Sequence, residues 1–300
     1  MTTTSDYFKL HFIVLLWGFT AILGKLISIP AVEMVFYRTL LAAAGMGVVM
    51  LYLKTSFRLS SSDFWKIFFT GFIVAAHWLT FFISGRIANA SVSLVGFATG
   101  SLWTALIEPL VKRKKIQVIE VGLGLVVITG LYIIFSFDFQ YPLGLLLGIA
   151  SGLTMAMFAV INSTFVNRIH PFTITFYEMT GACVAVILFF PIYKNLWSAD
   201  HQLHLAPSGM DWIYIAAMAW ACSVYAYSVA LNLMKKISVF LISLSLNLEP
   251  VYGIIMAVLI FGDSEKMNSN FYIGTAVILC AVLSYPLLKS RIASASEQPT

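Results

Sequence analysis

The chain has 300 residues, of which 60% are hydrophobic and 10% are charged, and its formal net charge at pH 7 is +5. Soluble domains carry about 25% charged residues, so this chain cannot cover a water-exposed surface with polar groups. The composition excludes an ordinary soluble enzyme and indicates a protein embedded in a lipid bilayer. Its basic residues form short clusters between apolar runs, which indicates loops facing anionic lipid and not a nucleic-acid-binding surface.

The beginning of the chain and its cysteines agree with a membrane protein. The first residues, MTTTSDYFKL, lack a basic leader and a convincing cleavage site, so we interpret the first apolar run as a retained span. Cys183, Cys222 and Cys280 all fall inside apolar runs. Their odd number and irregular spacing are not typical of a disulfide framework or a metal site.

Long apolar runs follow one another along the whole chain. A membrane helix needs about 20 mostly apolar residues. We predict ten spans, at residues 8–27, 31–53, 64–86, 90–111, 116–136, 143–167, 171–193, 211–233, 237–261 and 271–289. Pro109 and Pro250 fall within two of these runs and are expected to kink them. The fold class is therefore an all-α polytopic membrane protein.

The basic residues are distributed unevenly between the two sides of the predicted spans. With a cytoplasmic N-terminus, thirteen of the eighteen fall on the inner side: Lys9, Lys54, Arg58, Lys66, Lys112, Arg113, Lys114, Lys115, Arg168, Lys235, Lys236, Lys289 and Arg291. Four fall outside, namely Lys25, Arg86, Lys194 and Lys266, and Arg38 lies within a span. This positive-inside bias predicts that both termini are cytoplasmic.

The two halves of the chain share a short motif. FYR at residues 36–38 recurs 140 positions later as FYE at residues 176–178, with the sign of the charge reversed. Because five spans are an odd number, a repeated five-helix half would enter the membrane in the opposite direction, an arrangement that recurs in secondary transporters. Short Phe-Tyr matches also arise by chance in apolar sequence, but the ten-span count supports the repeat independently.

A series of local features occurs in a characteristic order. They are Trp17-Gly18, Pro30, Arg38, Ala90-Ser91, Gly122 through Gly130, Ser238, Pro250, Gly262-Asp263 and Gly274. In this order they resemble an EamA-type transporter of the drug/metabolite transporter superfamily. The resemblance implies ten helices in two inverted five-helix repeats, at 7–137 and 142–289, followed by a polar tail at 290–300. Many members have Gly-Glu where this chain has Gly262-Asp263, so no role is carried over to that acid.

Four ionisable side chains fall well inside predicted spans. A helix rises about 1.5 Å per residue, which predicts Arg38, His77 and Glu249 at one level, about 10 Å from the outer face. Glu178 is predicted at the mirror depth, near the inner face. Such groups must face the bundle interior or water. For Arg38, Glu178 and Glu249 two roles stay open, contact with a substrate or coupling ion and a structural ion pair, and Glu249 is the best partner for Arg38 by level.

Aromatic and small polar side chains within the spans form the predicted substrate pathway. It comprises Trp17, His77, Trp78, Phe81, Trp103, Phe158, Tyr225, Ser245 and Asn247. An aromatic wall with a few polar groups suits amphipathic organic solutes, although aromatic side chains also fill helix interfaces. Tyr225, Ser228 and Asn232 are spaced to share one helix face. Gly96 and Gly100 form a GxxxG pair that allows close helix packing within the bundle.

These features favour a secondary transporter that moves small organic metabolites by alternating access, with amino acids or amphipathic aromatic compounds as substrates and export favoured over import. No GxxxxGK[ST] motif is present, so a solute or proton gradient is the expected driving force. An intramembrane enzyme is the first alternative, but the five histidines are scattered and neither HExxH nor GxSxG occurs. A passive channel is the second.

The expected surroundings of the protein follow from the same features. We expect a multi-pass protein of the bacterial inner membrane, as a monomer or homodimer, with no catalytic residues. The expected partners are a small organic solute, membrane lipid and a proton as coupling ion, with no nucleic acid. No cofactor or metal is expected, because two histidines beside Asp200 in one loop are a weak metal motif.

Overall fold

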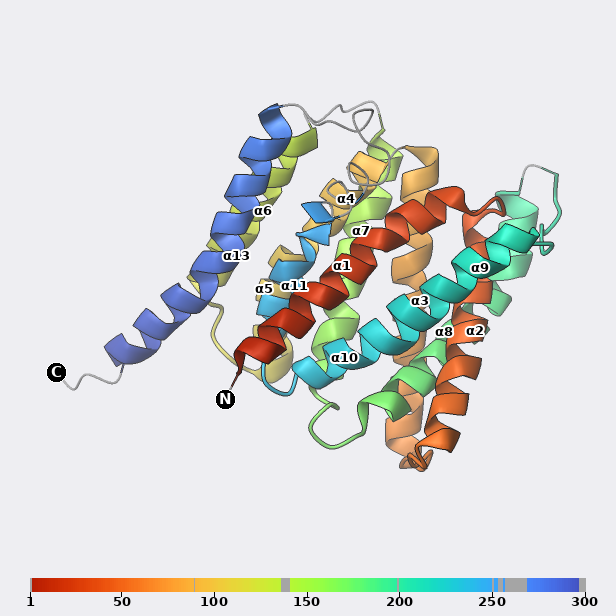
Figure 1. Ribbon diagram of the computed structural model, residues 1–300, viewed down its shortest axis with the longest axis horizontal. Helices are drawn as coiled ribbons and strands as arrows, with labels where there is room; N and C mark the ends of the chain where they lie inside the picture. Colours follow the sequence, from red (N-terminus) through yellow and green to blue (C-terminus); the bar gives the residue numbers. More distant parts are fainter. Residues whose placement is uncertain are drawn as a thin grey trace.

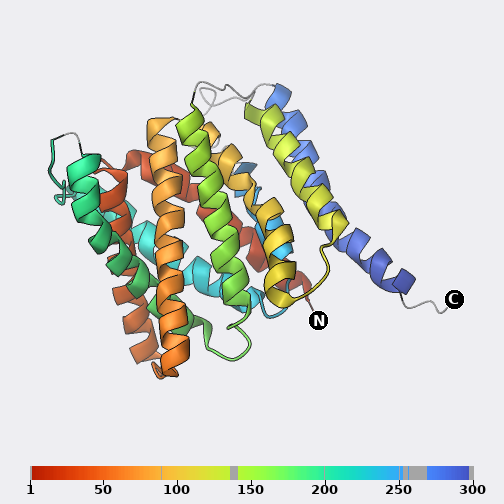
Figure 2. The ribbon, with the colours of Figure 1, turned by 180° about the vertical axis from the view of Figure 1, so that it is seen from behind.

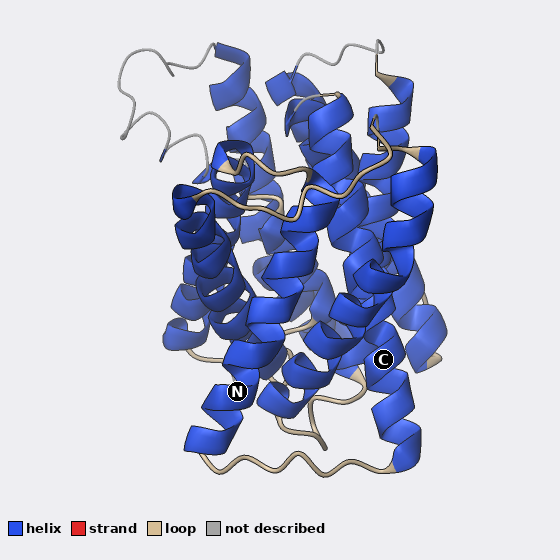
Figure 3. Cartoon of the chain, turned by 90° about the vertical axis from the view of Figure 1, so that its right-hand side faces the viewer, coloured by secondary structure: helices blue, strands red, loops and turns tan. Residues whose placement is uncertain are grey.

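The computed structural model describes residues 2–88, 90–135, 141–198, 200–249, 251, 252, 256 and 269–296. Within these residues the chain is helical throughout and contains no strand (Figure 3). The elements are α1 (Thr4–Leu26), α2 (Ala31–Tyr52), α3 (Ser61–Ile87), α4 (Ala90–Ala98), α5 (Gly100–Lys112), α6 (Val118–Phe135), α7 (Pro142–Ser163), α8 (Pro171–Leu196), α9 (Gly209–Ala217), the π-helix η1 (Met218–Tyr225), α10 (Ala226–Leu233), α11 (Val239–Leu246) and α13 (Ser269–Ser296).

Local sequence signals determine where several of these helices begin. Thr3 and Asp6 form a capping box at the start of α1, so the helix begins several residues before the apolar run predicted at 8–27. Ser208 and Asp211 form the same box at the start of α9. Proline occupies the first position of both α7 and α8. An N–H group at this position would have no partner within the helix, so proline can begin the helix without the loss of a hydrogen bond.

Seven helices of the described chain are long and apolar enough to cross a membrane. They cover Thr4–Gly24, Ala31–Tyr52, Ser61–Ile87, Val92–Lys112, Pro142–Ser163, Pro171–Leu196 and Gly209–Leu233. Two shorter apolar helices, Val118–Ile133 and Tyr272–Leu288, correspond to the predicted fifth and tenth spans. Of the predicted span 237–261, the structure describes α11 and a few residues after it, and the remainder, including Pro250, lies outside the described residues.

The helices pack into one bundle with a helix pair along one edge. Figure 1 shows α6 and α13 side by side at that edge, and Figure 2 shows the same pair from behind. In the main body α3 packs against α7 and α8, α2 packs against α8 and η1, and α1 packs against α10. The start of α1 and the end of α13 lie toward the same end of the bundle (Figure 1).

Glycines bring some of these helices into backbone contact. A Cβ added to Gly96 would lie 2.6 Å from the Cα of Gly148 on α7, and one added to Gly100 would overlap Met155 of the same helix. The predicted close packing at the GxxxG pair within the bundle is therefore confirmed. A glycine also allows close packing of α3 on α8, where Gly71 faces the backbone of Glu178 and Ala182.

Three elements differ from the sequence-based expectation. The predicted fourth span is divided into α4 and α5 at Thr99, ten residues before the proline that was expected to kink it. The predicted eighth span contains the π-helix η1 between α9 and α10. Helix α13 continues to Ser296, across most of the predicted polar tail, because the sequence KSRIASAS contains no proline or glycine to end it.

Candidate functional site

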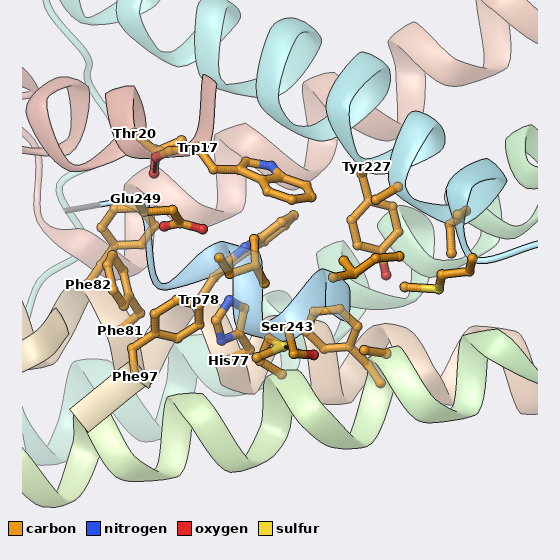
Figure 4. A pocket seen from close by; sticks show the side chains of 18 of the residues that line it. Trp17, Thr20, His77, Trp78, Phe81, Phe82, Phe97, Tyr227, Ser243 and Glu249 are labelled. Atoms are coloured by element: carbon orange, nitrogen blue, oxygen red, sulfur yellow. Dashed lines mark hydrogen bonds between the residues drawn. The ribbon is translucent and has the colours of Figure 1, made fainter. Parts of the chain in front are cut away.

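The main body encloses a cavity with an empty volume of about 780 Å³, which we call the central cavity (Figure 4). Its walls come from α1, α2, α3, α4, α7, α10 and α11, together with Glu249 just beyond α11. The lining residues are Trp17, Thr20, Arg38, His77, Trp78, Phe81, Phe82, Phe97, Met155, Phe158, Ala159, Tyr227, Ala230, Leu231, Met234, Ile242, Ser243, Leu246 and Glu249. Both halves of the chain therefore contribute to one cavity.

A continuous row of rings forms part of the wall. Neighbouring ring centroids are 5.3 Å apart for Phe82 and Phe81 and 5.6 Å apart for Phe81 and Phe97. The row continues from Phe97 through His77 and Phe158 to Tyr227, with centroid separations of 5.6, 5.5 and 6.0 Å. In Figure 4 Glu249 lies near the Phe82 end of the row and Tyr227 lies at the other end. Such a wall offers an extended apolar surface to a ligand.

Arg38 is the positive charge of the central cavity. Its side chain is buried, its Nε donates a hydrogen bond to Ser223 Oγ at 2.9 Å, and its guanidinium carbon lies 4.0 Å from the ring centre of Trp78. The stacking and the hydrogen bond fix the plane of the guanidinium. Among the described residues, no hydrogen bond from its Nη1 or Nη2 atoms is present, so these donors remain available to a ligand.

Glu249 supplies the acidic side chain of the cavity. It lines the same cavity as Arg38, which agrees with the prediction that the two residues lie at the same depth. The two do not form a direct ion pair, because none of the four ion pairs in the described chain includes either residue, but both line the same cavity. Arg38 is instead held by Ser223 and Trp78, on the wall formed by α2, α3 and η1. The cavity therefore presents a basic and an acidic side chain beside an aromatic wall.

The π-helix η1 packs against both α1 and α2, next to the cavity residues Trp17 and Arg38. Ser223, the partner of Arg38, lies in η1, and its Oγ also donates to the carbonyl of Met218 five residues earlier. The indole N–H of Trp17 donates to the carbonyl of Cys222 at 2.9 Å. A π-helix displaces backbone groups from the regular α-helical hydrogen bonds. In η1 this leaves the carbonyl of Cys222 to accept from Trp17 on α1, and it positions Ser223 to accept from Arg38 on α2.

His77 lines the cavity but is also held by a neighbouring helix. Its Nδ1 lies 2.8 Å from Ser151 Oγ and 3.0 Å from the Ser151 carbonyl oxygen on α7. These contacts bond His77 to a neighbouring helix. His77 therefore joins α3 to α7 and places its ring in the aromatic row.

Glu178 lies outside the central cavity, in a buried polar cluster on α8. Its Oε2 accepts hydrogen bonds from Tyr227 Oη at 2.8 Å and from Asn162 Nδ2 at 3.3 Å. Tyr227 contributes to both the central cavity and this cluster, because its ring lines the cavity and its hydroxyl donates to Glu178. The mirror-related positions 38 and 178 therefore have separate partners.

Of the predicted pathway residues, Trp17, His77, Trp78, Phe81 and Phe158 line the central cavity. Trp103, Tyr225, Ser245 and Asn247 do not. Ser245 and Asn247 are buried and bond backbone carbonyls near the end of α11, such as that of Leu244. Short polar side chains commonly satisfy their own helix end in this way.

The sequence-based prediction also missed residues of the cavity. Tyr227 lies two positions after the predicted Tyr225, on a different face of the helix. Phe82 and Phe97 were not singled out because aromatic residues within spans are common and their rotation about the helix axis is invisible without neighbours. Ser223 had a detectable signal, a serine in an apolar run, but its partner Arg38 is 185 positions away.

Tyr225, Ser228 and Asn232 lie together on a second hollow, which we call the α10 groove and which has an empty volume of about 1420 Å³. The predicted shared face is therefore present, although it faces away from the central cavity. The groove is also lined by basic side chains, Lys9, His170, Lys235 and Lys236. Lys236 pairs with Asp6 at 3.1 Å.

Comparisons with known proteins agree with this architecture. The model of the EamA-like transporter family matches residues 7–136 and again residues 142–285. A crystal structure, described only as that of a protein, has the same fold with a TM-score of 0.76 and 16% sequence identity, covering 97% of this chain and 99% of that chain. No curated protein matches the chain. The two family matches span most of the sequence, and the chain belongs to the EamA-like transporter family.

Proposed function

We propose that this protein moves a zwitterionic small organic solute with an apolar or aromatic body, such as an amino acid, across the bacterial inner membrane by alternating access. The observation that carries the proposal is the pairing of Arg38 and Glu249, as separate charges, on the walls of one aromatic cavity. A carboxylate suits the free guanidinium donors of Arg38, and an ammonium group suits Glu249. The aromatic row accommodates the body of the solute.

The proposed transport cycle requires two inverted five-helix repeats within ten spans. Helix packing supports this arrangement, because each contact of one half with the other has an equivalent with the halves exchanged. The contact of α3 with α8 corresponds to that of η1 with α2, and the contact of α3 with α7 corresponds to that of α10 with α1. The contact of α4 with α7 corresponds to that of α11 with α1. Rocking of one half against the other would expose the shared cavity to each side in turn. We place both termini in the cytoplasm and favour export as the physiological direction.

The test is solute binding and counterflow with purified protein. A thermal-shift series of an aromatic amino acid, its desamino acid and its decarboxylated amine is expected to give the largest stabilisation with the complete zwitterion. In proteoliposomes, preloaded zwitterion is expected to drive saturable uptake of label without chemical conversion. Chemical conversion would favour an enzyme, and uptake that never saturates would favour a channel.

Replacement of Glu249 by glutamine tests recognition of the ammonium group of the solute separately from recognition of its carboxylate. Glu249→Gln is expected to weaken binding of the zwitterion by about tenfold, because a charge-assisted hydrogen bond is worth about 1.5–3 kcal/mol. Binding of the desamino acid, which lacks the ammonium group, is expected to change by less than about twofold. The measurement is a binding isotherm for each ligand.

Glu108→Gln is the matched control, because Glu108 is a second acid within a predicted span but pairs with Lys112 and does not line the cavity. It is expected to leave both affinities unchanged. An equal loss for zwitterion and desamino acid in Glu249→Gln would remove Glu249 from recognition of the ammonium group.

A further inference from the structure

We propose that Glu178, Asn162 and Tyr227 form a proton-binding site that is separate from the acid of the central cavity and is linked to that cavity through Tyr227. The inference deepens the proposed transport function by locating the coupling ion, and it therefore rests on that function. It has four structural supports: two unpartnered oxygens, the absence of a nearby counter-charge, a hydroxyl pathway from the α10 groove, and the position of Tyr227.

The first support is an incomplete hydrogen-bond network. Glu178 and Asn162 are both 0% exposed. Glu178 Oε2 accepts from Tyr227 and Asn162, whereas Glu178 Oε1 and Asn162 Oδ1 have no partner among the described residues. Two buried acceptors without a donor are costly. A proton on Oε1 would add the donor that this cluster lacks.

The second support is the charge around Glu178. Helices α2, α3, α7 and α10 surround it, and their ionisable side chains are Glu33, Tyr37, Arg38, Tyr52, Asp63, Lys66, His77, Arg86 and Tyr227. Arg38 is bonded to Ser223, His77 to Ser151, and Asp63 to Arg168. Among the described residues, Tyr227 is the ionisable side chain that contacts Glu178, and no cation pairs with it.

An unpaired carboxylate at this position would carry a large desolvation cost. Protonation removes the charge and supplies a hydrogen-bond donor in the same step. A metal cation would also neutralise the site, but hard cations such as Ca²⁺ and Mg²⁺ take about six or more oxygen ligands. The cluster offers four oxygens, the two of the Glu178 carboxyl group, Asn162 Oδ1 and the Tyr227 hydroxyl, which is fewer than these cations take and favours a proton.

The third support is a route by which a proton can arrive. Ser228 lines the α10 groove, and its Oγ lies 3.1 Å from Thr175 Oγ1. Thr175 and Glu178 are three residues apart on α8 and therefore share a face of that helix. Hydroxyl groups can both donate and accept, so these two side chains lead from the groove toward Glu178. The described hydrogen bonds end at Thr175, whose hydroxyl donates to the Pro171 carbonyl, one helical turn from Glu178.

The fourth support is the link to the solute. The Tyr227 hydroxyl donates to Glu178, while its ring ends the aromatic row of the central cavity. Loss of the proton from Glu178 would turn the cluster into an anion that binds this hydroxyl more strongly. Tyr227 is thus a positioning residue, and protonation of Glu178 would be transmitted to the cavity through the orientation of its ring.

The experiment compares transport that needs a proton gradient with transport that does not. For Glu178→Gln in proteoliposomes, the ratio of pH-gradient-driven accumulation to counterflow is expected to fall by about tenfold or more. Glutamine keeps the shape and neutrality of the protonated acid but cannot exchange a proton. The matched control Glu108→Gln is expected to keep the wild-type ratio. Tyr52→Phe, at an exposed tyrosine that lines neither the central cavity nor the α10 groove, serves as the control for Tyr227→Phe.

A direct readout is the infrared band of a buried carboxylic acid in the detergent-purified protein. A component of this band is expected in the wild-type protein and in Glu249→Gln, is expected to be lost in Glu178→Gln, and is expected to shift in Tyr227→Phe, where one hydrogen bond is lost. If Glu178→Gln does not fold, the wild-type band and its shift in Tyr227→Phe decide the question. An unchanged transport ratio in Glu178→Gln, accumulation driven by a sodium gradient alone, or no shift in Tyr227→Phe would overturn the proposal.

These readouts also separate this proposal from the proposed function. If the wild-type protein shows no counterflow of zwitterions but the infrared band behaves as expected, the solute assignment fails and the proton site stands. If counterflow is normal and the band is absent, the proton site fails and the cavity assignment stands.

Discussion

Replacement of Arg38 by glutamine is expected to weaken binding of carboxylate-bearing solutes by about 10- to 100-fold. A hydrogen bond to a charged group contributes about 1.5–3 kcal/mol, and each 1.4 kcal/mol of binding free energy changes the affinity about tenfold. Arg38 is 2% exposed, is fixed by Ser223 and Trp78, and lines the cavity with no described hydrogen bond from its Nη atoms. A preorganised donor pair of this kind loses little entropy on binding. The measurement is the affinity for the zwitterion and for its decarboxylated amine.

Two further substitutions sharpen this prediction. Arg38→Lys keeps the charge but loses the planar group that stacks on Trp78, so we expect an intermediate loss of affinity. Arg168→Gln removes an arginine that pairs with Asp63 away from the cavity, and it is expected to leave solute affinity unchanged. If Arg38→Gln weakened the zwitterion and the amine equally, Arg38 would act on the shape of the cavity and not on a carboxylate.

Depth along a helix could be predicted from the sequence, because each residue adds a fixed rise. Arg38, His77 and Glu249 were predicted at one level, and all three line the central cavity. Glu178 was predicted at a different depth and lies in a different cluster. Family membership was likewise accessible, because the order of the motifs along the chain does not depend on side-chain orientation.

Rotation about the helix axis was harder to predict. Tyr225, Ser228 and Asn232 share a face as expected, but the sequence does not show that this face lines the α10 groove while Tyr227 faces the cavity. The preceding π-helix changes the register of the chain, and no residue type marks it. Level alone also does not give lateral distance, so it could not decide whether Arg38 and Glu249, which line the same cavity, form a direct ion pair.

Substitution of Gly181 by leucine is expected to have the largest effect on folding. A Cβ added there would lie 3.0 Å from the carbonyl carbon of Phe68 on α3 and closer still to its oxygen. Backbone cannot move aside as a flexible side chain can, so α3 and α8 would have to separate. We expect a loss of more than about 3 kcal/mol, above the usual range for overpacking. The measurement is thermal stability and the monodisperse fraction in detergent.

Gly122→Leu is the matched control, because nothing lies within 4 Å of a Cβ at this position on α6. It is expected to be neutral or slightly stabilising, since leucine has a higher helix propensity than glycine. The contrast tests whether contact between α3 and α8, rather than glycine itself, maintains the fold. Because α3 carries His77 and Trp78 while α8 carries Glu178, their separation would disturb the central cavity and the Glu178 cluster together. Wild-type stability of Gly181→Leu would show that the two helices are not in backbone contact in the membrane.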